Sequence, residues 1–300
     1  MTDLARAPDR RLIAILEGLF SVIVWGGSFV ATKVALANAA PVTVVWLRFG
    51  IGVLLLGVAV SLRRQWRLPG WTDLGYFALL GLIGITFHQW LQSTGLLTAR
   101  ATTTAWIVAT IPVFMALLGW LVLHEKLTRR QIVGILLAGV GVLVILSKGD
   151  LKQIFLGRFG TIGDFLILVS APNWAVFSAL SRRGLRQYPA ALMIFFVMLF
   201  GWIFSSFLFL IKPGFSAILA IQPQSWAGIL FLGIFASGLA YVTWYDALQV
   251  LPVAQAGAFV YIEPFVTVLV AAWVLREPFG LMELLGALTI LAGIWLVNRN

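Results

Sequence analysis

Residues 105–145 read AWIVATIPVFMALLGWLVLHEKLTRRQIVGILLAGVGVLVI, and residues 257–297 read GAFVYIEPFVTVLVAAWVLREPFGLMELLGALTILAGIWLV. A shift of 152 residues aligns the prolines, the glutamates and two glycines of these stretches: Pro112 with Pro264, Glu125 with Glu277, Gly134 with Gly286, and Gly141 with Gly293. Apolar matches are common in a hydrophobic chain, but these residues in one register are not. Each stretch predicts an apolar helix with an early proline, a turn that carries glutamate, and a second apolar helix. We therefore expect two related halves, a pattern typical of membrane transporters.

The composition is that of a protein embedded in a membrane. Of the 300 residues, 61% are hydrophobic and 11% are charged, and the mean hydropathy is +1.00, whereas a soluble domain is about 25% charged. The net charge of +10 comes from Lys and Arg in short connections between apolar runs, which indicates membrane orientation and not nucleic-acid binding. Because the chain has no cysteine and two histidines, disulfides and thiolate metal sites are excluded, and no metal or cofactor is expected.

Ten apolar runs are long enough to cross a bilayer as helices. A spanning helix needs about 20 residues, and the runs cover residues 12–36, 42–61, 73–95, 99–122, 130–147, 161–181, 190–211, 225–248, 254–275 and 281–297. The first run is too long for the core of a signal peptide, so we expect it to remain as a helix. The sequence thus predicts an all-α membrane protein with ten transmembrane helices.

The positions of Lys and Arg predict how these helices are oriented. With the N-terminus in the cytoplasm, the cytoplasmic segments contain 13 of these residues and the external segments contain 7, so both termini are expected in the cytoplasm. Each half contains five helices, an odd number, and the second half therefore runs upside down relative to the first. We expect a first repeat at residues 12–147, a linker at 148–160 and a second repeat at 161–297, arranged as inverted repeats around a central cavity.

Polar and aromatic side chains recur on one face of several predicted helices, which favours a place in the cavity lining. In the first helix, Trp25 and Ser28 share a face with Ser21, and Trp174 has the corresponding place in the sixth helix. A tryptophan near the middle of a span is less readily explained as an interface anchor than one near an end. The residues expected to bind substrate are Trp25, Ser28, His88, Gln92, Trp106, Thr110, Asn173, Trp174, Phe177, Tyr241, Trp244 and Tyr261.

Ionisable residues inside a membrane are costly, and they are functional candidates by default. The candidate proton carriers are His88, Glu17 and Asp164. Each has a structural alternative: a packed helix contact for His88, a side chain that reaches the cytoplasmic interface for Glu17, and a helix N-cap for Asp164. Arg48 is expected to reach the outer interface or to pair with an acid.

The chain resembles the drug/metabolite transporter superfamily, EamA type, at several of these positions. The Trp-Gly mark of that family near the middle of the first helix matches WGGSF at residues 25–29, and its second-repeat counterpart matches Gly163-Asp164 followed by Trp174. The LEP segment of the family is similar to YIEP at residues 261–264.

Two glutamates complete the resemblance. Glu125 and Glu277 match the GE turns of the family, although His124 and Arg276 stand in place of the glycine, and we expect both glutamates to cap helix turns. The resemblance covers residues 12–297 and implies two inverted five-helix repeats and export through the inner membrane of a bacterium. Within the superfamily, the chain is most similar to YddG-type exporters of aromatic and other amino acids, because the candidate cavity residues are aromatic and weakly charged.

The sequence therefore predicts a secondary transporter that exports amino acids or similar small metabolites by alternating access. No P-loop is present, so the energy is expected to come from gradients, either by uniport or by proton-coupled antiport. The expected partners are a small-molecule substrate and the lipid bilayer, without nucleic acid, and the chain is expected to be a monomer.

Other functions remain open from the sequence. A multidrug exporter of cationic compounds in the same superfamily would need a carboxylate in the cavity, for which Glu17 or Glu263 are the candidates. A receptor, a scaffold or an intramembrane enzyme would not explain an inverted repeat. No Ser-His or paired-carboxylate motif stands in a catalytic context, so we do not expect an enzyme.

Overall fold

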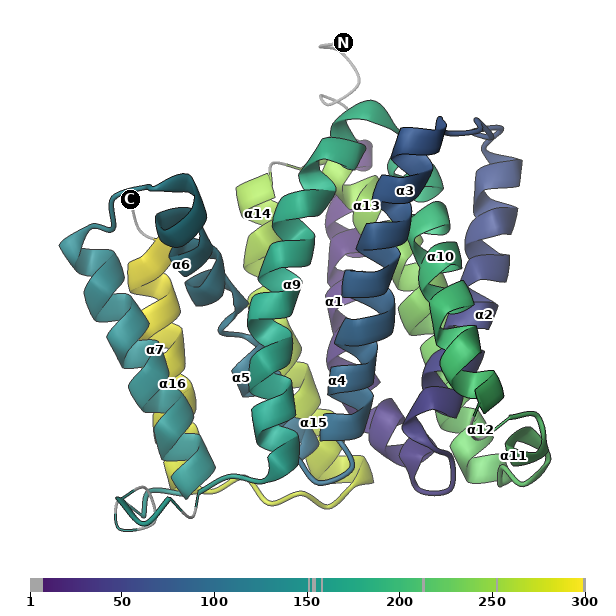
Figure 1. Cartoon of the computed structure of the whole chain (residues 1–300). Helices are drawn as coiled ribbons and strands as arrows, with labels where there is room; N and C mark the ends of the chain where they lie inside the picture. Colours follow the sequence, from purple (N-terminus) through teal and green to yellow (C-terminus); the bar gives the residue numbers. More distant parts are fainter. Residues whose placement is uncertain are drawn as a thin grey trace.

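The computed structural model describes residues 8–150, 152, 155–157, 159–211, 214–251 and 253–298. In these residues all regular secondary structure is helical, and ten spans are long and apolar enough to cross a membrane, which confirms the predicted fold class. The helices lie side by side in one bundle, and the first helix begins on the face where the last helix ends (Figure 1). We call this the termini face. The opposite face is called the linker face, because residues 148–160 connect the two halves there, although part of that linker lies outside the described residues.

Six of the ten spans are continuous helices: α1 (Pro8–Leu36), α2 (Pro41–Leu62), α7 (Arg129–Ser147), α9 (Ile162–Gln187), α10 (Ala190–Ile211) and α16 (Leu281–Asn298). Four spans are interrupted. The third consists of α3 (Trp71–Leu80), the π-helix η1 (Gly81–Phe87) and α4 (His88–Gly95), and the eighth of α12 (Pro223–Leu230), the π-helix η2 (Phe231–Leu239) and α13 (Ala240–Val250). The fourth consists of α5 (Ala101–Val108) and α6 (Ile111–Leu123), and the ninth of α14 (Val253–Phe259), the 3₁₀-helix η3 (Val260–Ile262) and α15 (Glu263–Val274). A short helix, α11 (Ser216–Leu219), precedes α12.

The interruptions of the fourth and ninth spans follow from their prolines. Pro112 lies in the first turn of α6 and Pro264 in the first turn of α15. Proline is tolerated at such a position because its missing N–H has no partner there, but it removes the hydrogen bond that would continue the preceding helix. Each span is therefore divided at the same place in its half of the chain.

Helices α7 and α16 pack against each other along two pairs of glycines. A Cβ atom added to Gly134 would lie 2.5 Å from the carbonyl oxygen of Gly293, and one added to Gly141 would lie 2.7 Å from that of Gly286. The later glycine of each helix meets the earlier one of the other, so the two helices are antiparallel. Only residues without a side chain allow backbones to approach so closely in a membrane.

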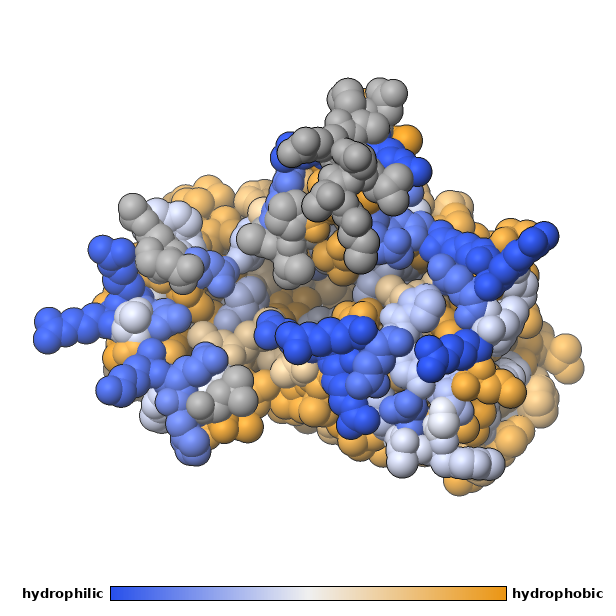
Figure 2. Space-filling model, turned by 90° about the horizontal axis from the view of Figure 1, so that it is seen from above, coloured by the Kyte–Doolittle hydropathy of each residue, from blue (hydrophilic) through white to orange (hydrophobic). Residues whose placement is uncertain are grey.

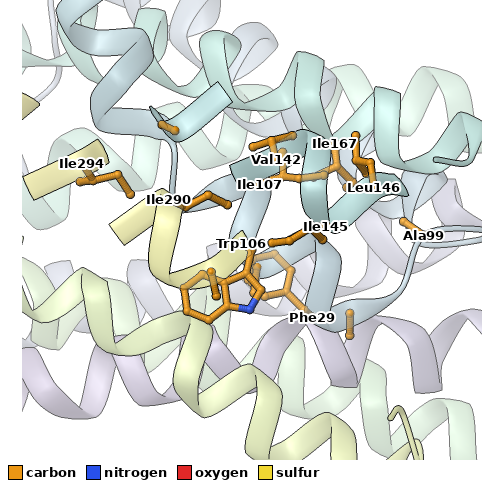
Figure 3. Packing of buried hydrophobic residues seen from close by; sticks show 14 of the residues in the cluster. Phe29, Ala99, Trp106, Ile107, Val142, Ile145, Leu146, Ile167, Ile290 and Ile294 are labelled. Atoms are coloured by element: carbon orange, nitrogen blue, oxygen red, sulfur yellow. The ribbon is translucent and has the colours of Figure 1, made fainter. Parts of the chain in front are cut away.

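Two hydrophobic cores lie on either side of the middle of the bundle. One surrounds Trp106 and joins α5, α7 and α16, and Figure 3 shows Trp106 against Phe29 with Ile145 and Ile290 nearby. The other surrounds Phe49 and joins α2, α3 and α10.

The termini face is hollowed. Seen from that side, hydrophilic residues surround a recess in the middle of the molecule (Figure 2). The helical segments at the two faces of the bundle differ in their packing. At the linker face, α5 packs against α1, α9 and α15, whereas at the termini face α14 packs against α1 and α13.

Candidate functional site

Three aromatic residues meet between α1 and α13, and we call them the Trp25 cluster. The ring centroid of Trp25 lies 5.5 Å from that of Tyr241, edge to face, and 5.3 Å from that of Trp244. The indole N–H of Trp25 donates to the carbonyl oxygen of Ala236 at 3.1 Å, a residue within η2. The half-buried Trp25 is thus fixed by the π-helix of the eighth span and leaves part of its ring exposed.

A second cluster forms between α4 and α9, and we call it the His88 cluster. The ring of His88 lies 4.7 Å from that of Trp174, which lies 4.8 Å from that of Phe177. His88 is 4% exposed, and its Nδ1 atom has no hydrogen-bond partner among the described residues. Trp25 and Trp174 both pack against the core around Phe49, so the two clusters share one wall of the molecule.

Three other predicted site residues lie beside these clusters. Asn173 donates from Nδ2 to the carbonyl oxygen of Ile83 in η1 at 3.0 Å, and the Ser28 hydroxyl donates to the carbonyl oxygen of Trp25 at 2.7 Å. Both polar groups are therefore engaged with backbone. The side chain of Gln92 is half-buried and makes no hydrogen bond in the described part of the chain.

The remaining predicted site residues lie elsewhere in the bundle. Trp106 is 2% exposed in the core that Figure 3 shows, and its Nε1 atom has no partner among the described residues. It borders an apolar cavity of about 210 Å³ between α15 and α16. Thr110 donates to the carbonyl oxygen of Ile107 at 2.6 Å at the break between α5 and α6. The Tyr261 hydroxyl contacts Asn298 at the end of α16.

The two acidic residues predicted as proton carriers lie near opposite faces. Glu17 is in electrostatic contact with the pair that Arg63 forms with Asp246, in which Nη1 and Nη2 of Arg63 donate to the two carboxylate oxygens at 2.7 and 2.6 Å. These hydrogen bonds to Asp246 raise the pKa of Arg63 above its usual value. Asp164 is buried near the linker face as part of a capping box, where Oδ2 accepts from Thr161 N at 2.7 Å. Its Oδ1 atom has no partner among the described residues.

Glu263 is the first residue of α15, at the interruption of the ninth span. It is half-buried, its carboxylate makes no hydrogen bond or ion pair in the described ranges, and it lies within electrostatic range of Tyr241. Its backbone is held against α1, because a Cβ atom on Gly26 would lie 2.8 Å from the Glu263 carbonyl oxygen. The sequence suggested Glu263 for a cationic substrate, and the structure brings it to the middle of the bundle.

The expectation for Arg48 is wrong. The sequence suggested that it reaches the interface or pairs with an acid, but Arg48 is 6% exposed and donates from Nε to the Ser237 hydroxyl at 3.0 Å and from Nη1 to the Gln89 side-chain oxygen at 3.3 Å. The helix is turned so that position 48 faces α4 and η2. Sequence periodicity did not reveal this, because the partners are far away in the chain.

The linker face is closed by polar contacts between segments that are distant in sequence. Glu277 accepts hydrogen bonds from Ala101 N at 2.9 Å, from Thr102 N at 3.1 Å and from Thr102 Oγ1 at 2.9 Å. Arg100 lies 2.9 Å from Glu283, which ties the start of α5 to α16.

Two further contacts close the same face. Thr98 accepts from Gly163 N at 3.0 Å, and Lys33 donates to the carbonyl oxygens of Leu96 and Ala99 at 3.1 and 2.6 Å. These bonds tie α1 and α9 to the connection between α4 and α5. Because the linker face is closed and the termini face has a recess, the bundle is accessible from the termini face.

Known proteins share this architecture. Residues 12–147 and 161–299 each match the EamA-like transporter family. A solved crystal structure superposes with a TM-score of 0.66 at 21% identity, covering 95% of this chain and 97% of the other, which supports the fold.

Relatives of similar length are transporters by name. An uncharacterized transporter of Archaeoglobus fulgidus is 29% identical over 93% of this chain and 95% of its own length. The transporter YvbV of Bacillus subtilis is 29% identical over 98% of this chain and 93% of its own length. A protein of Streptantibioticus cattleyicolor described as a probable terminal-alkyne amino-acid exporter is 28% identical over 96% of this chain and 94% of its own length. With ten apolar spans and a match over both halves, the chain belongs to the EamA-like transporter family.

Proposed function

We propose that this transporter exports amino acids, aromatic ones among them, or similar small metabolites, and that it does so by alternating access across the inner membrane of a bacterium. The observation that carries the proposal is the pairing of the Trp25 cluster with the His88 cluster on one wall of the bundle. Flat aromatic walls suit the side chains of aromatic and aliphatic amino acids, because they bury apolar surface and allow offset stacking. The name of the Streptantibioticus relative supports the same substrate class.

The proposed mechanism rests on an inverted repeat. Under the shift of 152 residues, the pair Gly134–Gly293 becomes Gly286–Gly141, which is the second pair of the α7–α16 contact. A two-fold axis between these helices accounts for that exchange. The π-helices η1 and η2 also contain residues related by this shift, Gly81 and Gly233. Two halves related in this way can exchange their conformations and open the cavity to either side.

The proposed resting state is open to the cytoplasm. Arginines gather near the termini face, with Arg63, Arg64 and Arg67 after α2 and Arg182, Arg183 and Arg186 at the end of α9, and such an excess favours a cytoplasmic location. The recess opens on that face (Figure 2), while Glu277 and Arg100 close the other. This is the state in which an exporter takes up its substrate.

The experiment that tests this proposal measures uptake into proteoliposomes with a panel of labelled amino acids, with and without a pH gradient. We expect phenylalanine and similar residues to enter faster than into liposomes without protein. A dependence on the gradient would indicate proton antiport, and its absence would indicate uniport. If a cationic drug enters and no amino acid does, the amino-acid proposal is wrong.

A cationic drug is the second candidate substrate because of Glu263. A half-buried carboxylate without a partner in the described residues, within electrostatic range of Tyr241, can attract a cation through its charge. The Glu263→Gln variant distinguishes the candidates. It should abolish uptake of a permanently cationic, carboxylate-free compound if that class is the substrate, and a variant as active as the parent toward such a compound would remove this candidate.

A further inference from the structure

Arg48 is a buried arginine in the membrane-spanning part of the chain, and no acid neutralises it in the described structure. Its side chain lies between α2, α4 and η2, with its guanidinium carbon 4.8 Å from the ring centroid of Phe49. The ion pairs formed among the described residues belong to Arg63, Arg100 and Arg183 instead. A guanidinium in the membrane interior is costly without an anion, and such residues therefore mark sites where a counter-charge is bound.

The two spans that contain π-helices meet at this guanidinium. Ser237, which accepts from Nε of Arg48, lies within η2, and Gln89, which accepts from Nη1, is the second residue of α4, the helix that continues η1. A π-helical segment is rare, and it is found frequently at functional sites, because the widened turn redirects side chains. The eighth span is thus distorted where it holds Arg48, and the distorted segment of the third span ends two residues before Gln89.

Part of the guanidinium remains available. Nη2 makes no hydrogen bond in the described part of the chain, whereas Nε and Nη1 make one each. The bond from Nη1 to Gln89, at 3.3 Å, is near the long limit for a hydrogen bond and can be exchanged for a stronger one. Two adjacent nitrogens can therefore donate to one carboxylate in the forked geometry that distinguishes arginine from lysine.

Arg48 lies next to the aromatic residues of the proposed substrate site. Tyr241 is its titratable neighbour, and His88 is within electrostatic range as well. Tyr241 belongs to the Trp25 cluster, and both Arg48 and Glu263 lie within its electrostatic range. A substrate carboxylate bound at Arg48 would therefore place the body of the substrate beside these aromatic rings.

We infer that Arg48 binds the carboxylate of the transported substrate, and that the substrate class is therefore that of small carboxylates with an apolar or aromatic body. The inference rests on the proposed transport function, which it extends by naming the group that is recognised. Arg48 supplies the counter-charge site, Ser237 and Gln89 position the guanidinium, and the Trp25 cluster contacts the body of the substrate.

The test compares phenylalanine with phenylalaninamide, which has the same body but no carboxylate. Equilibrium binding to the purified protein in detergent is measured for the parent and for Arg48→Gln, Arg48→Lys and Arg64→Gln. The parent should prefer phenylalanine by about tenfold or more, since a charge-assisted forked pair is lost in the amide. Arg48→Gln should lose the preference, and Arg48→Lys should retain part of it, because the charge remains and the fork does not. Arg64→Gln removes an exposed arginine near the end of the same helix and should leave the preference unchanged.

A second variant keeps the inference testable if Arg48→Gln does not yield folded protein. Ser237→Ala removes the acceptor for Nε, so phenylalanine should bind more weakly while the affinity for phenylalaninamide stays the same. Equal losses for both compounds would show that Ser237 matters for the fold alone and would overturn the positioning of Arg48.

The outcomes separate this inference from the proposed function. If Arg48→Gln still prefers phenylalanine as the parent does, Arg48 is not the carboxylate site, whereas amino-acid transport stands. If the parent binds no amino acid, the proposed function fails. The carboxylate site at Arg48 is then tested with benzoate and phenylacetate, whose binding is measured as a rise in the melting temperature of the protein. Stabilisation of the parent and not of Arg48→Gln would support the site, and no difference between the two would overturn it.

Discussion

Replacing Glu277 by glutamine should open the linker face. The Glu277 carboxylate, whose side chain is 10% exposed, accepts three hydrogen bonds from Ala101 and Thr102 and lies 3.8 Å from Nε of Arg100. A hydrogen bond to a charged group contributes about 1.5–3 kcal/mol. Glutamine keeps one acceptor oxygen but turns an NH₂ group toward the donors of Thr102, and it lacks the charge that attracts Arg100.

The expected loss is equivalent to one strong charge-assisted bond. A loss of about 2–3 kcal/mol should lower the ratio of molecules with a closed linker face to molecules with an open one about 30- to 150-fold, because about 1.4 kcal/mol changes an equilibrium constant tenfold. The effect acts on the closed state alone, because α5 and the connection after α15 separate when the face opens. The variant should therefore populate a state that is rare in the parent protein.

Cysteine alkylation measures this change, since the chain contains no cysteine. Thr32→Cys places a thiol near the linker end of α1, where Thr32 is 4% exposed, and a membrane-impermeant maleimide added from the external side reports access to it. The rate of labelling should rise with the population of the open state. Labelling that increases less than about threefold would show that the Glu277 bonds do not hold this face closed, because the expected increase is at least about 30-fold.

Glu125 is the matched control. It corresponds to Glu277 under the shift of 152 residues, but it is exposed and forms no ion pair or side-chain hydrogen bond among the described residues. Glu125→Gln should leave the labelling of Thr32→Cys within about twofold of the parent rate, as substitutions of exposed groups usually do. An equal rise in both variants would attribute the effect to lost charge in general and not to the closing contacts.

Three further predictions concern the site, the frame and proton coupling. Trp25→Ala and Trp174→Ala should reduce amino-acid transport at least about tenfold without preventing membrane insertion, whereas Trp273→Ala, at an exposed position, should leave transport unchanged. Flux into proteoliposomes measures this, and a parental flux in both variants would show that Trp25 and Trp174 serve packing alone. Gly141→Val should destabilise the protein by about 1–3 kcal/mol and lower its melting temperature, because a Cβ at position 141 would lie 2.7 Å from the Gly286 carbonyl oxygen. Gly139→Val should leave the melting temperature unchanged, because a Cβ at that position meets nothing within 4 Å. Equal melting temperatures of the two variants would refute the close packing of α7 and α16. His88→Ala should abolish any pH dependence of transport if His88 carries the coupled proton, and an unchanged pH profile would exclude His88 from that role.

The sequence was sufficient for the spans and the fold class because both depend on local composition. Long apolar runs separated by Pro, Gly and charged residues predicted ten helices, and the structure has ten spans at nearly the same residues. The sequence placed Pro112 and Pro264 near the starts of their helices, and the structure interrupts both spans just before these prolines. The capping expected for Glu277 is also present, because the residue caps the start of α5, whereas Glu125, for which capping was expected as well, forms no side-chain hydrogen bond among the described residues.

Features that depend on partners distant in the chain were not predictable in the same way. Arg48 finds Ser237 and Gln89 across 189 and 41 residues, and nothing in the spacing of α2 indicates those contacts. The π-helices lack a sequence signature beyond their glycines. Asp164 illustrates an alternative that the sequence left open, since its capping box with Thr161 lies near the linker face and leaves only one carboxylate oxygen without a partner in the described residues.

The most direct test of carrier function is counterflow. Proteoliposomes are loaded with unlabelled phenylalanine and diluted into a trace of labelled phenylalanine, with no pH gradient or membrane potential. We expect the label to accumulate transiently above its external concentration, because a carrier with one alternately exposed site exchanges inner for outer substrate. The same vesicles without protein set the background. A label that only equilibrates with the external concentration, or does not enter at all, would contradict the alternating-access transport of amino acids.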